Sequence, residues 1–479
     1  MLSYHTCPLA TLGGKDTGGM NVYVRELTRC LGQMGISVDV FTRSQDEHVP
    51  HVLHDLGYGN RVVHIPAGPE RPLPKPDLAG YLPQFVTGIQ EFAAHKGVHY
   101  DLIHSHYWMS GVAAGALKQA WGVPVVHMFH TLGLMKQRVA RSNEEAEGAY
   151  RLDGERSVLR LADRIVAPTP AEVAQLQWLY QADTRKVTII PPGVDLSRFY
   201  PISQDEAKEV IGVPLCEQTI LFVGRIEPLK GVDTLIRAIG VLRQRGVFCC
   251  LTVIGGEPDS PSSAAGSEET AVAGSAVAAG SSNAAGSSIA AGSSNAAGSS
   301  EMARLRQMRE QAGLEDLVTF IGKRGQDTLP YYYSAADVVV VPSHYESFGM
   351  VALEAMACGT PVVASQVGGL AFLVQDGVTG FTVPVDDPHE LAGRLELILN
   401  DGDLRRRLGE QAVQAARVYA WENIARRMVD LYRSVADATL TVADAALTAA
   451  DAAVAGLDPA GVALTADYPG QPARQNEQL

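Results

Sequence analysis

Residues 338–364 read VVVVPSHYESFGMVALEAMACGTPVVA, and the order of elements in this stretch indicates the fold class. The four valines at 338–341 predict a buried strand that runs into a polar loop. A helix is expected to start near Phe348 and Gly349 and to end at Gly359, because glycine commonly follows the last helical turn. A second strand is expected at 361–364. Strand, helix and strand in this order are typical of a parallel sheet.

The same alternation of short apolar runs and helical patterns fills most of the chain. In the second half, strands are also expected at 219–223, 251–254 and 318–321. In the first half, a first strand is expected to end near His5. Further strands are expected at 38–41, 62–65, 102–105, 125–129, 164–167 and 187–190. Pro and Gly at 191–195 break the pattern and indicate a boundary. We therefore predict an α/β protein with two doubly wound parallel-sheet domains that face a cleft, where ligands bind beyond the carboxyl ends of the strands.

These patterns give explicit domain limits. The first domain is expected at 1–195 and the second at 196–418, with a helix at 419–435 that packs back on the first. Residues 258–300 are almost all Ala, Gly and Ser, which predicts a long flexible insertion in a surface connection. Residues 436–479 form an Ala-rich, low-complexity tail.

The tail carries a seven-residue repeat. An apolar residue follows three positions after each recurring aspartate, at Asp437 and Leu440, Asp444 and Leu447, and Asp451 and Val454. This spacing predicts one apolar stripe on a helix, weakly similar to a coiled coil and therefore a candidate for pairing in a homodimer. A solvated helical or disordered tail is the alternative, and residues 469–479 are expected to be disordered.

Composition excludes several classes of protein. The 479 residues include 53 acids and 39 bases, and the net charge of -14 argues against nonspecific nucleic-acid binding. No apolar run reaches the ~20 residues of a membrane span, and the N-terminus lacks the basic start and apolar core of a signal peptide. The six cysteines show no zinc or redox spacing, and Cys249 and Cys250 are expected to be buried free thiols. These features predict a cytoplasmic protein without a structural metal.

Two loops have the residues needed to bind phosphate. The glycines at 13–19 precede a helix expected from Met20, so backbone N–H groups and the helix dipole could meet an anion, although an ordinary tight turn explains them equally well. Arg225 and Lys230 follow the strand at 219–223 and therefore lie at the cleft. Together they can neutralise a diphosphate, including the charge that develops as it leaves. The alternative is a solvated loop with two surface cations.

The loop and helix after 341 add two carboxylates. Glu346 lies just past the strand end and should face the cleft, while the N–H groups of Gly349, Met350 and Val351 point toward a bound phosphate. Glu354 lies further along the helix, where its two oxygens could accept hydrogen bonds from the hydroxyls of a ribose. The alternative makes Glu354 a buried structural acid, which is costly without a partner.

Glu346 and Glu354, which have seven residues between them and are followed by CGTPVV, resemble the E-x7-E signature of the retaining glycosyltransferases of family 4. The stretch GRIEPLKG at 224–231 resembles the donor-phosphate loop of that family. The resemblance covers residues 1 to about 435 outside the insertion and implies the GT-B fold, with the acceptor on the first domain and a nucleotide sugar on the second. It also implies metal-independent catalysis with retention at the anomeric carbon, no cofactor, and UDP as the preferred nucleotide.

The resemblance also assigns roles to residues. The catalytic groups would be His130, Glu346, Arg225 and Lys230, with His130 against the transferred sugar; a structural histidine at a strand end is the alternative. The donor would contact Gly18, Gly19, Arg225, Lys230, Glu346, Phe348, Gly349, Met350, Val351 and Glu354.

Within the family, the motifs HTCPL at 5–9 and DTGGMNVY at 16–23 are most similar to those of the D-inositol-3-phosphate glycosyltransferases of mycothiol biosynthesis. This similarity implies a phosphorylated acceptor held by Asn21, Lys75, Tyr107, Thr131 and Arg151.

Three alternatives stay open. Sucrose-phosphate synthases share the DTGG motif but usually carry Gln-Val where this chain has Met20 and Asn21. A nucleotide-sugar epimerase or a phosphorylase would keep the fold, but the first needs extra acid and base groups and the second a lysine for pyridoxal phosphate. A non-catalytic nucleotide-sugar-binding scaffold is the alternative outside the enzymes, although such a protein should have lost part of the set Arg225, Lys230, Glu346 and Glu354.

Overall fold

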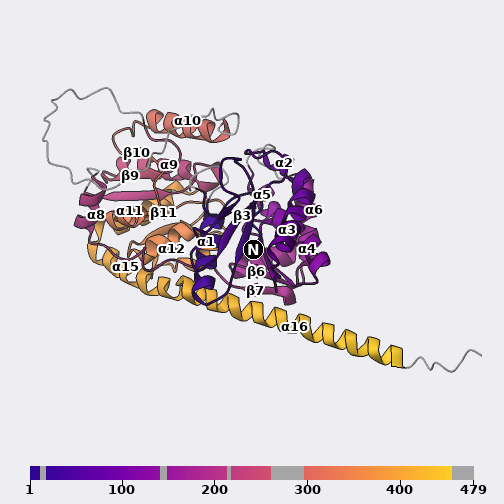
Figure 1. Cartoon of the computed structure of the whole chain (residues 1–479). Helices are drawn as coiled ribbons and strands as arrows, with labels where there is room; N and C mark the ends of the chain where they lie inside the picture. The colour runs from indigo at the N-terminus through magenta and orange to yellow at the C-terminus, as the bar shows by residue number, and fades with distance from the viewer. Residues whose placement is uncertain (11–17, 141–147, 213–216, 260–295, 456–479) are drawn as a thin grey trace, which may run out of the picture.

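The protein forms two lobes with helices on the faces of their sheets (Figure 1); the sheet of the second lobe is parallel, and that of the first is parallel except for the antiparallel pairing of β2 (Val52–Leu53) with β3 (Arg61–Ile65). The computed structural model describes residues 1–10, 18–140, 148–212, 217–259 and 296–455, with the backbone alone for 296–299 and 440–455. The predicted α/β class with two doubly wound domains is confirmed.

The sheet of the first domain has two parts that the N-terminal residues join. One part has the order β1-β3-β2 and the other β4-β5-β6-β7. Leu2 bridges Phe41 in the first part and Ser105 in the second, so residues near the N-terminus complete the sheet between them. The strands are β1 (Asp39–Arg43), β2 (Val52–Leu53), β3 (Arg61–Ile65), β4 (Ile103–His106), β5 (Val125–Met128), β6 (Arg164–Ala167) and β7 (Val187–Ile189).

Seven α-helices cover the described part of this sheet. Their apolar faces close a core in which Phe85, Met109 and Phe129 are fully buried. The helices are α1 (Gly19–Gln33), α2 (Lys75–Leu78), α3 (Leu82–Lys96), α4 (Trp108–Trp121), α5 (Gly133–Val139), α6 (Ala149–Leu161) and α7 (Pro170–Tyr180).

The second domain has one parallel sheet with the order β10-β9-β8-β11-β12-β13. Its central strands are rich in Val, Ile and Leu, as expected for a sheet covered on both faces. The strands are β8 (Thr219–Val223), β9 (Cys250–Ile254), β10 (Val318–Gly322), β11 (Val338–Val341), β12 (Val362–Ser365) and β13 (Gly380–Val383). The helices are α8 (Gln204–Ile211), α9 (Val232–Gln244), α10 (Ala296–Gln311), α11 (Leu329–Ala335), α12 (Met350–Ala357), α13 (Leu370–Leu373), α14 (Pro388–Asn400) and α15 (Gly402–Ala416).

The chain crosses between the domains twice, and the two crossings lie side by side. Val194 donates its N–H to the carbonyl of Tyr419 at 2.8 Å and forms a bridge with Ala420. The last helix, α16 (Trp421–Ala455), then runs beneath both lobes and continues past the first (Figure 1). Its start packs on α1, where Trp421 is 1% exposed and contacts the ring of Tyr23.

Most expected elements are confirmed, and the differences are informative. The strands β2 and β13 were not expected: β2 has two residues, and β13 contains Gly and Thr among its apolar residues. The strand expected to end near His5 is limited to the bridge at Leu2. Helix α10 begins five residues before the expected start at Glu301. The expectation of two free thiols is wrong at Cys250, which is disulfide-bonded, whereas Cys249 is a buried free thiol.

Two expectations fall mainly outside the described residues. The flexible insertion at 258–300 is described only at 258–259 and 296–300, and residues 469–479 lie beyond the described part. The backbone of α16 is continuous across the expected limit at 435/436, so the repeat up to residue 455 is helical. The side chains of the apolar stripe that begins at Leu440 are not described.

Candidate active site

A cavity of about 360 Å³ lies between the two domains, at the carboxyl ends of their strands. This is the position expected for ligands in open α/β sheets. Fifteen of the sixteen predicted site residues line it: Gly18, Gly19, Asn21, Lys75, Tyr107, His130, Thr131, Arg225, Lys230, Glu346, Phe348, Gly349, Met350, Val351 and Glu354. Arg151 lies behind the wall, as described below.

An ion pair between Lys230 and Glu346 lies on the side of the cavity that the second domain forms. Lys230 Nζ lies 2.6 Å from Glu346 Oε2, and both side chains are about one fifth exposed. Lys230 ends the short 3₁₀ turn η3 (Pro228–Lys230), and Glu346 lies in the loop between β11 and α12. The turn and the loop are tied together, because the N–H of His344 donates to the carbonyl of Leu229 at 2.8 Å. The pair therefore links the two loops that sequence reasoning assigned to donor binding.

Close backbone contacts fix the loop that carries Glu346. The N–H of Gly369 donates to the carbonyl of Glu346 at 3.1 Å. A Cβ on Gly368, whose φ is +44°, would lie 1.9 Å from that carbonyl oxygen. Because no side chain fits in that space, glycine is required where this segment passes the Glu346 loop. Sequence reasoning missed these glycines, since nothing local in Val367-Gly368-Gly369 relates them to residue 346.

Helix α12 begins at the cavity. Its N-cap, Gly349, has a φ of +107°, and a Cβ there would lie 2.5 Å from Leu370 Cδ2. Met350 and Val351 of the first helical turn line the same cavity as the ion pair. Since the N–H groups of a first helical turn have no acceptor within the helix, this end of α12 is attractive for an anion.

Glu354 lies on α12 and is 7% exposed. It is not an unpartnered acid, because the hydroxyl of Tyr333 donates to its Oε2 at 2.8 Å. Burial raises the pKa of the Glu354 carboxyl to about 7, against the hydrogen bond from Tyr333 and the charges of Arg198 and Arg25. Glu354 is therefore both anchored in the domain and part of the cavity wall.

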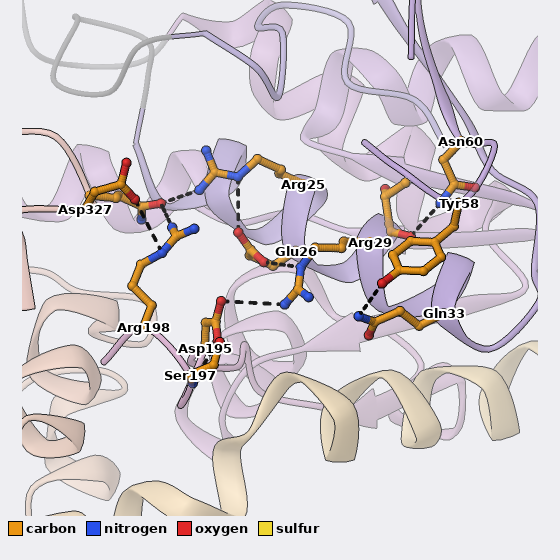
Figure 2. A network of polar contacts seen from close by, with 12 residues as sticks. Arg25, Glu26, Arg29, Gln33, Tyr58, Asn60, Asp195, Ser197, Arg198 and Asp327 are labelled. Carbon is orange, nitrogen blue, oxygen red and sulfur yellow. Dashed lines mark hydrogen bonds and ion pairs between the residues drawn. The ribbon is translucent and has the colours of Figure 1, made fainter. Parts of the chain in front are cut away.

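Charged side chains join the domains at one end of the cavity (Figure 2). Arg25 of α1 donates to the amide oxygen of Gln326 in the second domain. Arg198, just after the first crossing, donates to the same oxygen at 3.1 Å and lies 3.7 Å from Asp327. The contact of Arg25 with Gln326 therefore joins the two domains, and Arg198, which belongs to the second domain, holds the same amide oxygen. Sequence reasoning missed them, because the partners are 301 and 128 positions apart.

The first domain contributes Gly18, Gly19 and helix α1, whereas residues 13–17 of the predicted glycine loop lie outside the described residues. Gly18 is the N-cap of α1 and faces the second domain, because a Cβ on it would be 3.9 Å from Arg225 Nε. Asn21 is 1% exposed, and its amide already bonds three protein groups, namely the N–H of Gly18, the hydroxyl of Thr6 and the carbonyl of Cys7. These bonds position the start of α1. Contact of Asn21 with an acceptor stays a prediction.

Two residues with left-handed backbone conformations lie on the same wall. Tyr107 precedes α4 with a φ of 72°, and His130 follows β5 with a φ of 62°. Such conformations are uncommon for residues with a side chain and concentrate at functional sites. Both residues line the cavity. Burial lowers the pKa of His130 to about 3, so its imidazole is neutral at physiological pH.

Two cations converge on the Tyr107 ring. Lys75 Nζ lies 5.7 Å from the ring centroid, and Arg151 Cζ lies 5.0 Å from it. Arg151 is fully buried; it pairs with Glu155 at 2.8 Å and donates to the carbonyl and hydroxyl oxygens of Thr131 at 2.9 and 3.1 Å. Among the described residues, Arg151 supports Thr131 and Tyr107 from behind, and its direct contact with an acceptor stays a prediction.

A buried carboxyl that sequence reasoning missed connects the domains beside Glu346. Glu172 of α7 is 1% exposed, and it accepts a hydrogen bond at 2.7 Å from the hydroxyl of Ser347. Burial raises the pKa of Glu172 to about 7. Its only local signal is its position in the first turn after the N-cap Thr169, which indicates a helix start and says nothing of a distant serine.

Within the described ranges, no group of three or more His, Cys, Asp or Glu side chains is arranged to hold a metal ion. No helix in the same ranges is both long and apolar enough to cross a membrane.

Comparison with known proteins identifies the family. Residues 17–198 match the family described as Glycosyltransferase Family 4, and residues 203–415 match Glycosyl transferases group 1. The chain is 40% identical over 437 residues to D-inositol 3-phosphate glycosyltransferase 2 of Catenulispora acidiphila, which covers 90% of this chain and 93% of that protein. The D-inositol 3-phosphate glycosyltransferase of Actinosynnema mirum is 38% identical over 436 residues, with 90% and 96% covered.

A solved structure gives the same result. Sucrose-phosphate synthase from Thermosynechococcus elongatus matches with a TM-score of 0.77 and 35% identity, over 91% of this chain and 98% of that one. The chain therefore belongs to glycosyltransferase family 4 and is a glycosyltransferase with the GT-B fold. This assignment sets aside the non-catalytic scaffold, the epimerase and the phosphorylase.

Proposed function

We propose that this glycosyltransferase moves a hexose or N-acetylhexosamine from a UDP-sugar to an inositol phosphate. The observation that carries the proposal is the pair of cations at Tyr107, where Lys75 lines the cavity and Arg151 lies behind the ring. A positive wall opposite the donor loops suits an acceptor with a phosphate group. The two relatives at 40% and 38% identity are both D-inositol 3-phosphate glycosyltransferases, which supports inositol phosphate as that acceptor.

The donor is proposed to bind on the second domain. Arg225, Lys230 and the first turn of α12 would hold the diphosphate, and Glu354 would accept hydrogen bonds from the ribose. When Lys230 pairs with the bound diphosphate, Glu346 would be released from its ion pair with Lys230 and could orient the sugar. Gly18 and Gly19 would cover the diphosphate from the first domain, close to Arg225.

Transfer is proposed to retain the anomeric configuration without a protein nucleophile, metal ion or cofactor. Among the described residues, the carboxylates that line the cavity are Glu227, Glu346 and Glu354, and each is held by a partner in the second domain: Arg225, Lys230 and Tyr333 respectively. None of these three carboxylates comes from the first domain, which forms the side of the cavity opposite the proposed donor site. The departing phosphate oxygen can instead take the proton of the acceptor hydroxyl on the same face, and catalysis then rests on positioning and charge stabilisation.

Transfer of glucose to fructose 6-phosphate is a second candidate. The structural match to sucrose-phosphate synthase at 35% identity favours it, and the cations at Tyr107 would serve that acceptor phosphate as well.

A donor-by-acceptor screen tests both candidates. UDP-GlcNAc, UDP-glucose, ADP-glucose and GDP-mannose are each combined with inositol phosphate, fructose 6-phosphate and unphosphorylated inositol, while nucleotide release and product mass are followed. Product with inositol phosphate alone supports the first candidate, and product with fructose 6-phosphate alone supports the second. Transfer to unphosphorylated inositol at an equal rate would refute the proposed phosphate site.

The variant Lys75→Ala isolates the phosphate contact. Loss of one charge-assisted hydrogen bond corresponds to roughly a 10- to 100-fold rise in KM for the acceptor. Hydrolysis of the donor in the absence of acceptor should not change. Lys96→Ala, at an exposed position near the end of α3, is the matched control and should keep the wild-type KM.

A further inference from the structure

His106 is a buried histidine directly behind His130 that no sequence motif assigned a role. It ends β4 and is fully buried, whereas His130 follows the neighbouring strand β5 and lines the cavity. His106 Nδ1 lies 3.0 Å from His130 Nε2, which is hydrogen-bond distance. Two imidazole nitrogens share this contact, so one donates its proton and the other accepts.

The surroundings of His106 decide which one donates. Its second nitrogen, Nε2, is buried and has no hydrogen-bond partner among the described residues. If Nε2 carried the proton, an N–H group would be buried without an acceptor, which native structures avoid more strictly than an unused lone pair. The proton of His106 therefore belongs on Nδ1, from which it donates to His130.

The tautomer of His130 follows from this assignment. Because His130 Nε2 accepts from His106, the neutral ring of His130 carries its proton on Nδ1. In the described part of the chain no group bonds that Nδ1, and His130 is half-buried at the cavity wall. The free donor is then left to a ligand.

We propose that His106 is a positioning residue that holds His130 as the Nδ1–H tautomer, so that His130 presents an N–H donor to a hydroxyl oxygen of the transferred sugar. The tautomer rests on the protein alone, and the choice of a sugar hydroxyl as its partner rests on the proposed function. A neutral donor at this point orients the sugar and cannot act as the base that deprotonates the acceptor. Burial holds the pKa of His106 well below its ordinary value and that of His130 at about 3, which agrees with two neutral rings.

The tautomer can be measured without any substrate. The full-length protein is labelled with ¹⁵N-histidine, and long-range ¹H–¹⁵N spectra distinguish protonated from bare ring nitrogens. The variant His130→Gln identifies the His130 signals by their loss. We expect a protonated Nδ1 and a bare Nε2 at His130. A protonated Nε2 in the wild type would overturn the proposal, whatever the protein turns out to transfer.

Two variants test whether His106 sets this state. In His106→Asn the side-chain amide nitrogen replaces Nδ1 as a donor, whereas His106→Leu removes the donor. We expect the Nδ1–H form of His130 and kcat/KM within about three-fold of wild type in the Asn variant, and a mixture of tautomers with roughly a ten-fold loss of kcat/KM in the Leu variant. Affinity for the nucleotide alone should be the same in both.

A matched control separates this role from general damage to the sheet. His127→Asn changes another buried histidine on β5, whose ring bonds Ser105 at 2.8 Å and not His130, and the His130 signals should stay unchanged. If His130 keeps the pure Nδ1–H form in His106→Leu, His106 does not set the tautomer and the proposal is wrong. Since the spectra need no turnover, failure of the proposed donor or acceptor would show separately as inactivity of the wild type.

Discussion

Replacing Glu172 by Gln should remove a pH dependence of stability that the contact between the domains creates. Burial raises the pKa of this carboxyl from 4.5 to about 7. Between these values the folded protein holds a proton that the unfolded chain releases, so this group stabilises the folded state most at low pH. The contribution is lost as pH rises through about 7. The amide introduced by Glu172→Gln is uncharged throughout, so the variant should show no such loss.

The size of the effect follows from the shift. Since one pKa unit corresponds to about 1.36 kcal/mol, the full contribution is roughly 3 kcal/mol, most of which is lost between pH 5 and pH 8. The free energy of unfolding of Glu172→Gln relative to wild type should therefore rise by roughly 2 to 3 kcal/mol over this range. Glu354, whose pKa is also raised to about 7, is present in both proteins and cancels.

Urea unfolding at several pH values measures this difference. Tryptophan fluorescence reports the transition, and only the variant-minus-wild-type free energy is used at each pH. Glu91→Gln, at an exposed position on α3, is the control and should give a flat difference. A flat difference for Glu172→Gln as well would show that the carboxyl is solvated in solution, and the reasoning from its burial would fail.

Three further predictions concern the second domain. Lys230→Ala should lower kcat/KM by roughly 100- to 1000-fold, since it removes charge stabilisation of the leaving diphosphate. In the double variant Lys230→Ala, Glu346→Gln, the loss of activation free energy should be smaller than the sum of the losses in the two single variants, as measured by steady-state kinetics of the double-mutant cycle. Gly368→Ala should impair turnover about ten-fold or more by displacing the Glu346 loop, whereas Gly212→Ala, with a similar positive φ but open space, should change thermal stability slightly and activity not at all. Gly349→Ala should destabilise the protein by about 1–3 kcal/mol in urea unfolding, and an unchanged midpoint would contradict the strain expected at a φ of +107°.

Much of the fold and of the donor side could be predicted because the signals are local. The valines of β11, the glycine stop at Gly359 and the two glutamates of α12 and its loop lie within one short stretch. Their spacing places them at the carboxyl end of a strand without any knowledge of the rest. Arg225 and Lys230 follow β8 in the same manner. Residues of this kind are positioned by the element to which they belong.

The parts that could not be predicted depend on contacts between distant residues. Glu172 meets Ser347 across 175 positions, and Arg25 meets Gln326 across 301. Nothing next to Glu172 in the sequence indicates that another domain will bury it. The orientation of the Arg151 side chain could not be predicted either, because helix periodicity does not show whether it points to the cavity or pairs with the buried Glu155.

The double crossing at Val194 and Ala420 also bears on how the protein is made. The helix that starts at Trp421 fills part of the first domain's core against Tyr23, although more than two hundred residues of the second domain separate it from β7. As the chain leaves the ribosome, the first domain is thus synthesised early and completed last. Until α16 emerges, the apolar face of α1 is uncovered, and the second domain can fold while the first still waits for its final helix. A truncation before Trp421 should accordingly leave the second domain intact and the first one prone to aggregation.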